Sequence, residues 1–61
     1  MMNPNRLNND DIVPGLKVDK GVTTYTVKSH PRNGIFTAIG PDGMETRLAV
    51  EEVIQHIPGD D

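Results

Sequence analysis

Three features of the sequence predict a small all-β domain. Short runs rich in β-branched residues recur between residues 14 and 57, and none is long enough for an extended amphipathic helix. Two turns of similar composition, His30–Gly34 and Gly40–Gly43, separate the central runs. The chain has 61 residues and no cysteine, which favours one small domain without disulfide bonds. We therefore expect four to five antiparallel strands.

The two ends of the chain differ in composition from its middle. Residues 1–11 contain four of the five asparagines, and Leu7 is their only internal apolar residue, which predicts a disordered or loosely docked tail. Residues 58–61 combine proline and glycine with two aspartates, so we expect a disordered acidic C-terminus. The predicted domain comprises residues 12–57.

The first half of the domain contains two predicted strands. Pro14–Gly15 is a turn signal, and apolar and polar residues alternate in the short run Leu16–Val18 that follows it. Asp19–Gly21 is typical of a polar bend. Val22–Ser29 is the clearest strand, because β-branched and aromatic residues fill it and its apolar residues alternate.

The second half contains a predicted hairpin made of Ile35–Ile39 and Glu45–Val50. Proline suits the second position of the turn before each of these strands, and Asn33 and the glycines tolerate positive φ. Two registers are open for this hairpin. The first pairs Ile39 with Met44, and the second is shifted by one residue through a bulge at Gly43.

The register decides which side chains of the hairpin face the core. Pairing Ile39 with Met44 places Ile35 opposite Leu48 on the core face. The same pairing sends four residues to the opposite face, namely Phe36, Ala38, Glu45 and Arg47. We use this register to predict the surface of the domain.

The last apolar segment fits two structures. Its apolar residues follow helical spacing, yet it is short enough to be one helical turn followed by a strand. We favour a helical turn at Val50–Val53 and a short strand at Ile54–Ile57. In the alternative, Val50–Ile57 is one helix that packs against a four-stranded sheet.

The predicted order of elements resembles that of an SH3-like barrel of the KOW or Tudor type. The entry run Pro14–Val18 and the helical turn Val50–Val53 before the last strand carry this resemblance, which covers about three quarters of the chain. It implies an SH3-like barrel of four to five antiparallel strands with one short helical turn near the C-terminus. Such barrels mostly bind nucleic acids, peptides, methylated side chains or protein surfaces, and the fold alone does not choose among these partners.

The available side chains predict no catalytic, cofactor or metal site. Ser29 is the only serine, and its neighbour His30 points away from it if both lie at a strand end. The chain contains no glycine-rich phosphate loop. A zinc site is not expected, since there is no thiolate and His30 and His56 are far apart in the sequence. We expect His56 to face solvent.

The two aromatic residues, Tyr25 and Phe36, limit the classes of partner. A groove for proline-rich peptides or a cage for methylated lysine needs more aromatic side chains than these. We expect Tyr25 to lie in the core with its hydroxyl at the rim. The register places Phe36 on the surface, with burial in a curled sheet as the alternative.

The function that we predict is protein binding without catalysis. A chain this short gains stability from a partner, so we expect an accessory or inhibitory protein that docks on a larger protein or associates with itself. An apolar centre with a charged rim is typical of such contacts. The predicted contact residues are Phe36, Glu45, Arg47, His30, Arg32 and Asn33.

Nucleic-acid binding is the alternative function. The chain has a net charge of −3, but residues 14–50 contain five basic and three acidic side chains, which gives +2. Basic side chains in such a patch would contact phosphates. The predicted contacts are Lys17, Lys20, Lys28, Arg32 and Arg47.

Location is predicted from the absence of two sequence signals. No stretch approaches the roughly 20 apolar residues of a membrane span. Residues 1–5 lack the apolar core of a signal peptide. We therefore expect a cytoplasmic protein that does not bind membranes.

Overall fold

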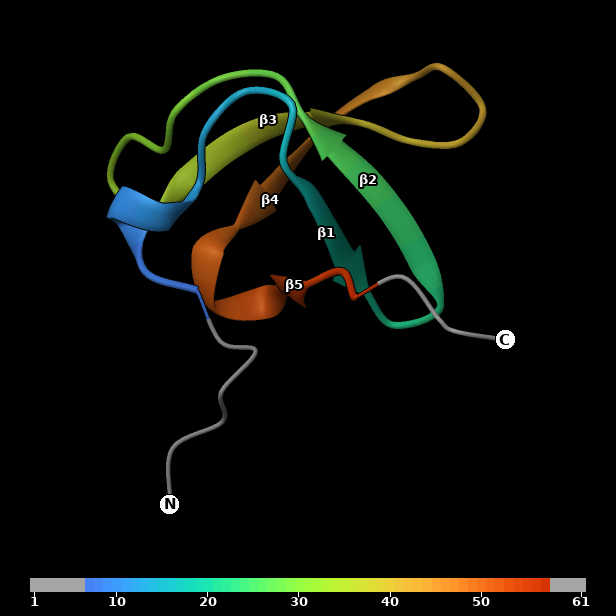
Figure 1. Cartoon of the computed structure of the whole chain (residues 1–61). Coiled ribbons are helices and arrows are strands. Elements are labelled where there is room, and N and C mark those ends of the chain that lie inside the picture. The colour runs from blue at the N-terminus through green and yellow to red at the C-terminus, as the bar shows by residue number, and fades with distance from the viewer. Residues whose placement is uncertain (1–6, 58–61) are drawn as a thin grey trace.

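The computed structural model describes residues 7–57, which form one antiparallel sheet of five strands (Figure 1). Two three-residue 3-10 turns, η1 (Asn9–Asp11) and η2 (Val50–Glu52), are the only helical elements in this part of the chain. The strands are β1 (Lys17–Lys20), β2 (Thr23–Val27), β3 (Ile35–Ile39), β4 (Glu45–Ala49) and β5 (Ile54–Gln55). The structure confirms the predicted all-β class, with a short helical turn before the final strand.

The order of the strands requires the sheet to curl. Across the sheet the order is β4-β3-β2-β1-β5, so β4 and β5 form its two edges. In a flat sheet these edges would lie about 19 Å apart, at about 4.8 Å per strand. The connection from Ala49 to Ile54 contains η2, and a 3-10 turn rises only about 2 Å per residue, so it cannot span that distance. The curl brings β4 and β5 near each other, and Figure 1 shows η2 between them.

The connection between β2 and β3 ends in a tight two-residue turn. Its central residues, Asn33 and Gly34, both have positive φ, +54° and +79°, as a type I′ turn requires. Arg32 and Ile35 on either side exchange two backbone hydrogen bonds of 2.8 and 3.0 Å. Pro31, expected at the second position of a turn, precedes this turn instead.

The register of the β3–β4 hairpin differs by one residue from the pairing of Ile39 with Met44. Gly43 has φ +84°, and its N–H donates to the Gly40 carbonyl at 3.0 Å, while the Gly40 N–H donates to the Met44 carbonyl at 3.0 Å. This turn with a glycine bulge pairs Ile39 with Glu45. The Ile39–Met44 register is therefore wrong, and the bulged alternative is correct.

The shifted register exchanges the two faces of β3. Phe36 lies opposite Leu48, and each of these side chains is 2% exposed, whereas Ile35 is 42% exposed. Tyr25 packs against the core from its rim. Buried apolar side chains fill the inside of the curl, and they are Leu7, Ile12, Val18, Val27, Phe36, Ala38, Leu48, Val50 and Val53.

The N-terminal segment joins this core at Leu7. The tail was predicted to extend to residue 11, but Leu7 is only 7% exposed and belongs to the core cluster. The Asn8 N–H donates to the Asp11 carboxylate at 3.0 Å across η1. The packed part of the described chain therefore begins before Ile12. The remaining tail predictions, for residues 1–6 and 58–61, lie outside the described residues.

The C-terminal segment has the turn and strand that the sequence favoured. After η2, β5 pairs antiparallel with β1, with Val18 opposite Gln55 and Asp19 opposite Ile54. Val53, between η2 and β5, is 2% exposed. This arrangement excludes the continuous C-terminal helix. No helix among residues 7–57 has the length and apolarity to cross a membrane.

Candidate functional site

A small pocket beside β3 brings together three residues singled out in the sequence, His30, Arg32 and Arg47. The pocket has a volume of about 240 Å³ and is bounded by the β2–β3 connection, β3 and β4. We call it the basic pocket, and its lining residues are Ser29, His30, Arg32, Ile35, Phe36, Thr37 and Arg47.

Strand pairing and the type I′ turn bring these residues together. Arg47 on β4 lies directly opposite Thr37 on β3, so the two side chains are neighbours on one face. The backbone bridge between Arg32 and Ile35 holds Arg32 at the start of β3. The Thr37 N–H donates to the Ser29 hydroxyl oxygen at 3.4 Å, which ties the β2–β3 connection to β3.

The basic pocket carries positive charge that the described residues do not neutralise. Its lining includes two guanidinium groups and one imidazole but no carboxylate. Three ion pairs occur between residues 7 and 57, and neither Arg32 nor Arg47 belongs to any of them. Glu45, which precedes Arg47 on the same face of β4, is paired with Lys28.

Three of the six residues predicted for a protein contact do not contribute to the exposed surface of this pocket. Phe36 lines the pocket from the core side, because the register buries its side chain. It cannot be the exposed apolar centre of a contact surface. Ile35 has that position instead. Asn33 lines a neighbouring groove and Glu45 lines a different pocket, whereas His30, Arg32 and Arg47 lie at the basic pocket.

Three residues of the pocket were not predicted from the sequence, namely Ser29, Ile35 and Thr37. The available signals were Asn33–Gly34, which is typical of a type I′ turn, and Gly43, which permits a bulge. Together they determine that Ile35, Thr37 and Arg47 share the outer face of the hairpin.

The five basic residues of the nucleic-acid prediction divide into separate groups. Lys20 lies 3.7 Å from Glu52, and Lys28 is paired with Glu45. Both pairs are exposed and therefore weak, but each places a carboxylate beside the amine. Lys17 is exposed on β1, which leaves Arg32 and Arg47 as the two that share a pocket.

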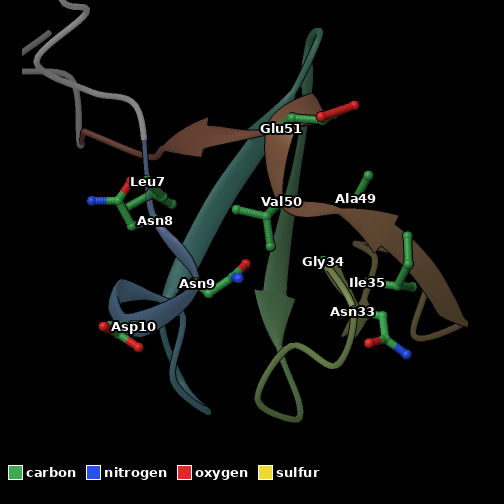
Figure 2. Close-up of a pocket in the computed structure, with 10 residues that line it drawn as sticks. All are labelled: Leu7, Asn8, Asn9, Asp10, Asn33, Gly34, Ile35, Ala49, Val50 and Glu51. Carbon is green, nitrogen blue, oxygen red and sulfur yellow. The ribbon is translucent and has the colours of Figure 1, made fainter.

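An open groove of about 610 Å³ adjoins the basic pocket (Figure 2). It lies between the N-terminal segment, the type I′ turn and η2, and its charged residues, Asp10 and Glu51, are both acidic. We call it the acidic groove. Its lining residues are Leu7, Asn8, Asn9, Asp10, Asn33, Gly34, Ile35, Ala49, Val50 and Glu51.

A third pocket, of about 430 Å³, lies between β2 and the β3–β4 loop. Tyr25 forms one wall, and a Cβ at Gly40 would meet its ring at 3.4 Å. Met44 is 67% exposed at the edge of this pocket. With Tyr25 as its only aromatic residue, the pocket lacks the several rings of a methyl-lysine cage.

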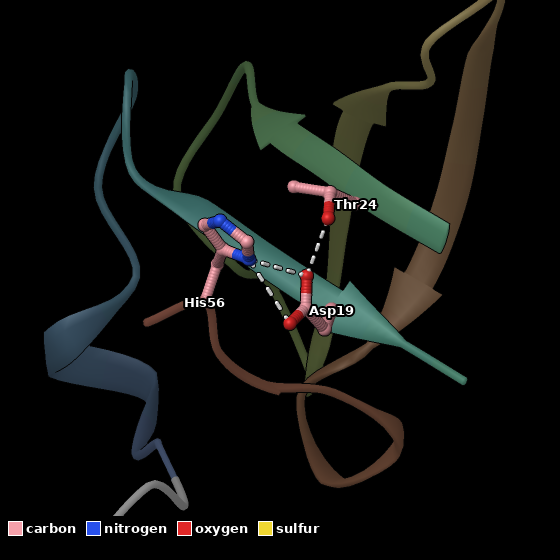
Figure 3. A network of polar contacts seen from close by, with 3 residues as sticks. All are labelled: Asp19, Thr24 and His56. Carbon is pink, nitrogen blue, oxygen red and sulfur yellow. Dashed lines mark hydrogen bonds and ion pairs between the residues drawn. The ribbon is translucent and has the colours of Figure 1, made fainter. Parts of the chain in front are cut away.

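His56 points toward the sheet, contrary to the prediction that it faces solvent. Its Nδ1 lies 2.9 and 3.1 Å from the two carboxylate oxygens of Asp19, and the Thr24 hydroxyl donates to Oδ1 of Asp19 at 2.6 Å (Figure 3). The backbone N–H of His56 also donates to the Lys17 carbonyl oxygen at 3.0 Å. The pairing of β5 with β1 therefore places residue 56 over Asp19.

This network shifts the titration of Asp19. The pKa of Asp19 is lowered from its ordinary value of 3.8, first by the hydrogen bond from Thr24 and then by the hydrogen bond and charge of His56. Burial acts in the opposite direction and raises the pKa. The net result is that Asp19 remains a carboxylate at neutral pH.

The Asp19, Thr24 and His56 network is arranged as a cross-link between strands. A catalytic triad needs the imidazole between the hydroxyl and the carboxylate, whereas here Asp19 lies between Thr24 and His56. It joins β1, β2 and the segment after β5. No group of three metal-binding side chains is found within the described range.

The chain has no detected relative from which a function could be transferred. Comparison with protein-family models, curated proteins and solved structures found no match. Its function must therefore be inferred from side chains and their arrangement.

Proposed function

We propose that the chain is a non-catalytic protein-binding module with an SH3-like barrel. The strand order and the position of η2 before the last strand support this fold assignment. The observation that carries the function is the basic pocket, where Arg32 and Arg47 lie together without a carboxylate in the lining. Its binding surface consists of this pocket with Ile35 at its edge.

The chemistry of this surface favours a protein partner with acidic side chains. Arginine is enriched at the energetic centres of protein interfaces, because its planar guanidinium group binds carboxylates through two hydrogen bonds. Ile35 is 42% exposed and supplies an apolar contact beside the two arginines. An accessory or inhibitory protein that docks on a larger protein, or associates with itself, would use such a surface.

Nucleic-acid binding is the second candidate, and the same two arginines support it. Phosphates are good ligands for guanidinium groups. Against it, Phe36 is the only aromatic residue of the pocket and is buried, so the pocket offers no exposed ring to stack on a base. Lys20 and Lys28 are also held in ion pairs.

A capture experiment separates the two candidates. The tagged chain is incubated with lysate of the organism that encodes it, with and without nuclease. Binding of a protein should survive nuclease and weaken in R32Q/R47Q. K17E is the matched control, because it lowers the net charge by the same two units and lies outside the pocket.

The outcomes decide whether the basic pocket binds a protein or a nucleic acid. Equal capture by R32Q/R47Q and wild type would contradict the proposal. Loss of all partners after nuclease would support the nucleic-acid candidate, and binding of a single-stranded oligonucleotide should then fall steeply with salt.

A further inference from the structure

The basic pocket and the acidic groove meet at one residue. Ile35 lines both of them, with Arg32 and Arg47 on one side and Asp10 and Glu51 on the other. The surface around Ile35 therefore has an exposed apolar centre between two regions of opposite charge.

The charged residues on both sides of Ile35 form no ion pair with one another or with any other residue between 7 and 57. None of the three ion pairs found in the described part of the chain includes Arg32, Arg47, Asp10 or Glu51. By contrast, Lys28, which directly follows β2, and Glu45 on β4 form an ion pair. The basic side chains therefore line one of the two hollows that share Ile35, and the acidic side chains line the other.

We propose that this surface binds a second copy of the chain in a symmetric dimer. A two-fold axis near Ile35 would place the basic pocket of each copy against the acidic groove of the other. The charge contact then occurs twice, while the two Ile35 side chains lie near the axis. This inference rests on the proposed function, because it names the partner of the same protein-binding surface.

The size of the chain gives the dimer a physical advantage. A domain of about 60 residues buries a smaller share of its surface than a larger one, so an interface adds appreciably to its stability. The contact has only one strongly apolar residue at its centre, and its affinity depends on charges. We therefore expect association to weaken with ionic strength.

Two charge-reversal variants test this pairing directly. R32E/R47E makes both sides of the surface acidic, and D10K/E51K makes both sides basic. Each variant alone should be monomeric, because like charges face each other in its dimer. An equimolar mixture should form a one-to-one dimer, because an acidic side then meets a basic side at both contacts.

The measurement is sedimentation velocity at low and moderate salt, with native mass spectrometry of the mixture. Single substitutions measure how much each residue contributes to the affinity of the dimer. R47E should weaken dimerisation about tenfold or more, whereas K17E, with the same change in charge, should have little effect. I35S should weaken the dimer without removing its salt dependence. Circular dichroism checks that every variant is folded.

Three results would overturn the proposal. They are a monomeric wild type at millimolar concentration and low salt, a dimer that both reversal variants retain, and reversal variants that do not combine. The proposed function is judged separately, because a monomer whose captured partner depends on Arg32 and Arg47 would still be a protein-binding module.

Discussion

The charged residues beside strands β1 and β5 have a different role from those beside β3 and β4. Beside β1 and β5, Asp19 binds both Thr24 and His56, and the Asp19 and His56 side chains are only 25% and 29% exposed. Beside β3 and β4, Arg32 and Arg47 have no acidic partner among the residues described. We infer that charges beside β1 and β5 hold strands together, whereas Arg32 and Arg47 beside β3 and β4 are available for binding.

This difference follows from how firmly backbone pairing and core packing hold each group of strands. Only two residue pairs join β5 to β1, so this short edge gains from a side-chain cross-link. The β3–β4 hairpin has five residue pairs and a buried Phe36. Because its backbone and core already hold it, its outer face can carry unpaired charge at little cost in stability.

The largest expected effect tests the two faces of β3. Phe36→Ala should lower the free energy of unfolding by about 3–5 kcal/mol, because it leaves a cavity in the core. Ile35→Ala, its neighbour on the outer face, should cost less than about 1 kcal/mol. Urea unfolding followed by circular dichroism measures both. Similar losses would contradict the observed register.

The next effect tests the cross-link on the β1 and β5 side. Asp19→Asn removes the charge that His56 and Thr24 contact, and should cost about 1–2 kcal/mol. Lys17→Gln is the matched control, since Lys17 is an exposed charged residue on the same strand and forms no ion pair with the described residues; it should change stability by less than about 0.5 kcal/mol. Thermal unfolding compares the two variants, and equal effects would show that the Asp19 network does not hold the strands together.

Acid unfolding should depend on the same carboxylate. The pKa of Asp19 in the folded chain is lower than 3.8, so its stabilisation is present above this value and is lost as pH falls through the lowered pKa. Asp19→Asn should lose less stability than wild type as the pH is lowered below about 4. Melting temperatures measured across this range test the prediction, and parallel profiles would contradict it.

The smallest effect concerns the ion pair between Lys28 and Glu45. These side chains are 54% and 51% exposed, so a double-mutant cycle to alanine should give a coupling of only about 0.2–1 kcal/mol. Salt should reduce it further. A larger, salt-insensitive coupling would show that the β3 and β4 side also depends on its charges for stability.

Local sequence signals predicted most of the fold. Asn33–Gly34 and Gly40–Gly43 identified the turns, because glycine and asparagine accept the positive φ that these turns need. The turn at Val50 and the strand at Ile54 were also predicted correctly. Each of these features depends on neighbours in the sequence.

Features that depend on distant contacts were harder to predict. His56 turns inward because β5 pairs with β1, which lies almost 40 residues earlier. One bulge residue at Gly43 reversed the face of Phe36 and thereby moved the predicted contact surface. Leu7 joins the core although polar residues surround it in the sequence.

The pairing of β5 with β1 also has a consequence for the order of folding. The pairs β1–β2, β2–β3 and β3–β4 each join strands that are consecutive in the chain, whereas β1 and β5 join residues 18 and 55. Closing the loop between them costs more chain entropy than forming any hairpin. We expect the four-stranded meander to form first and β5 to dock last, so a nascent chain reaches its complete sheet only when residue 56 has left the ribosome.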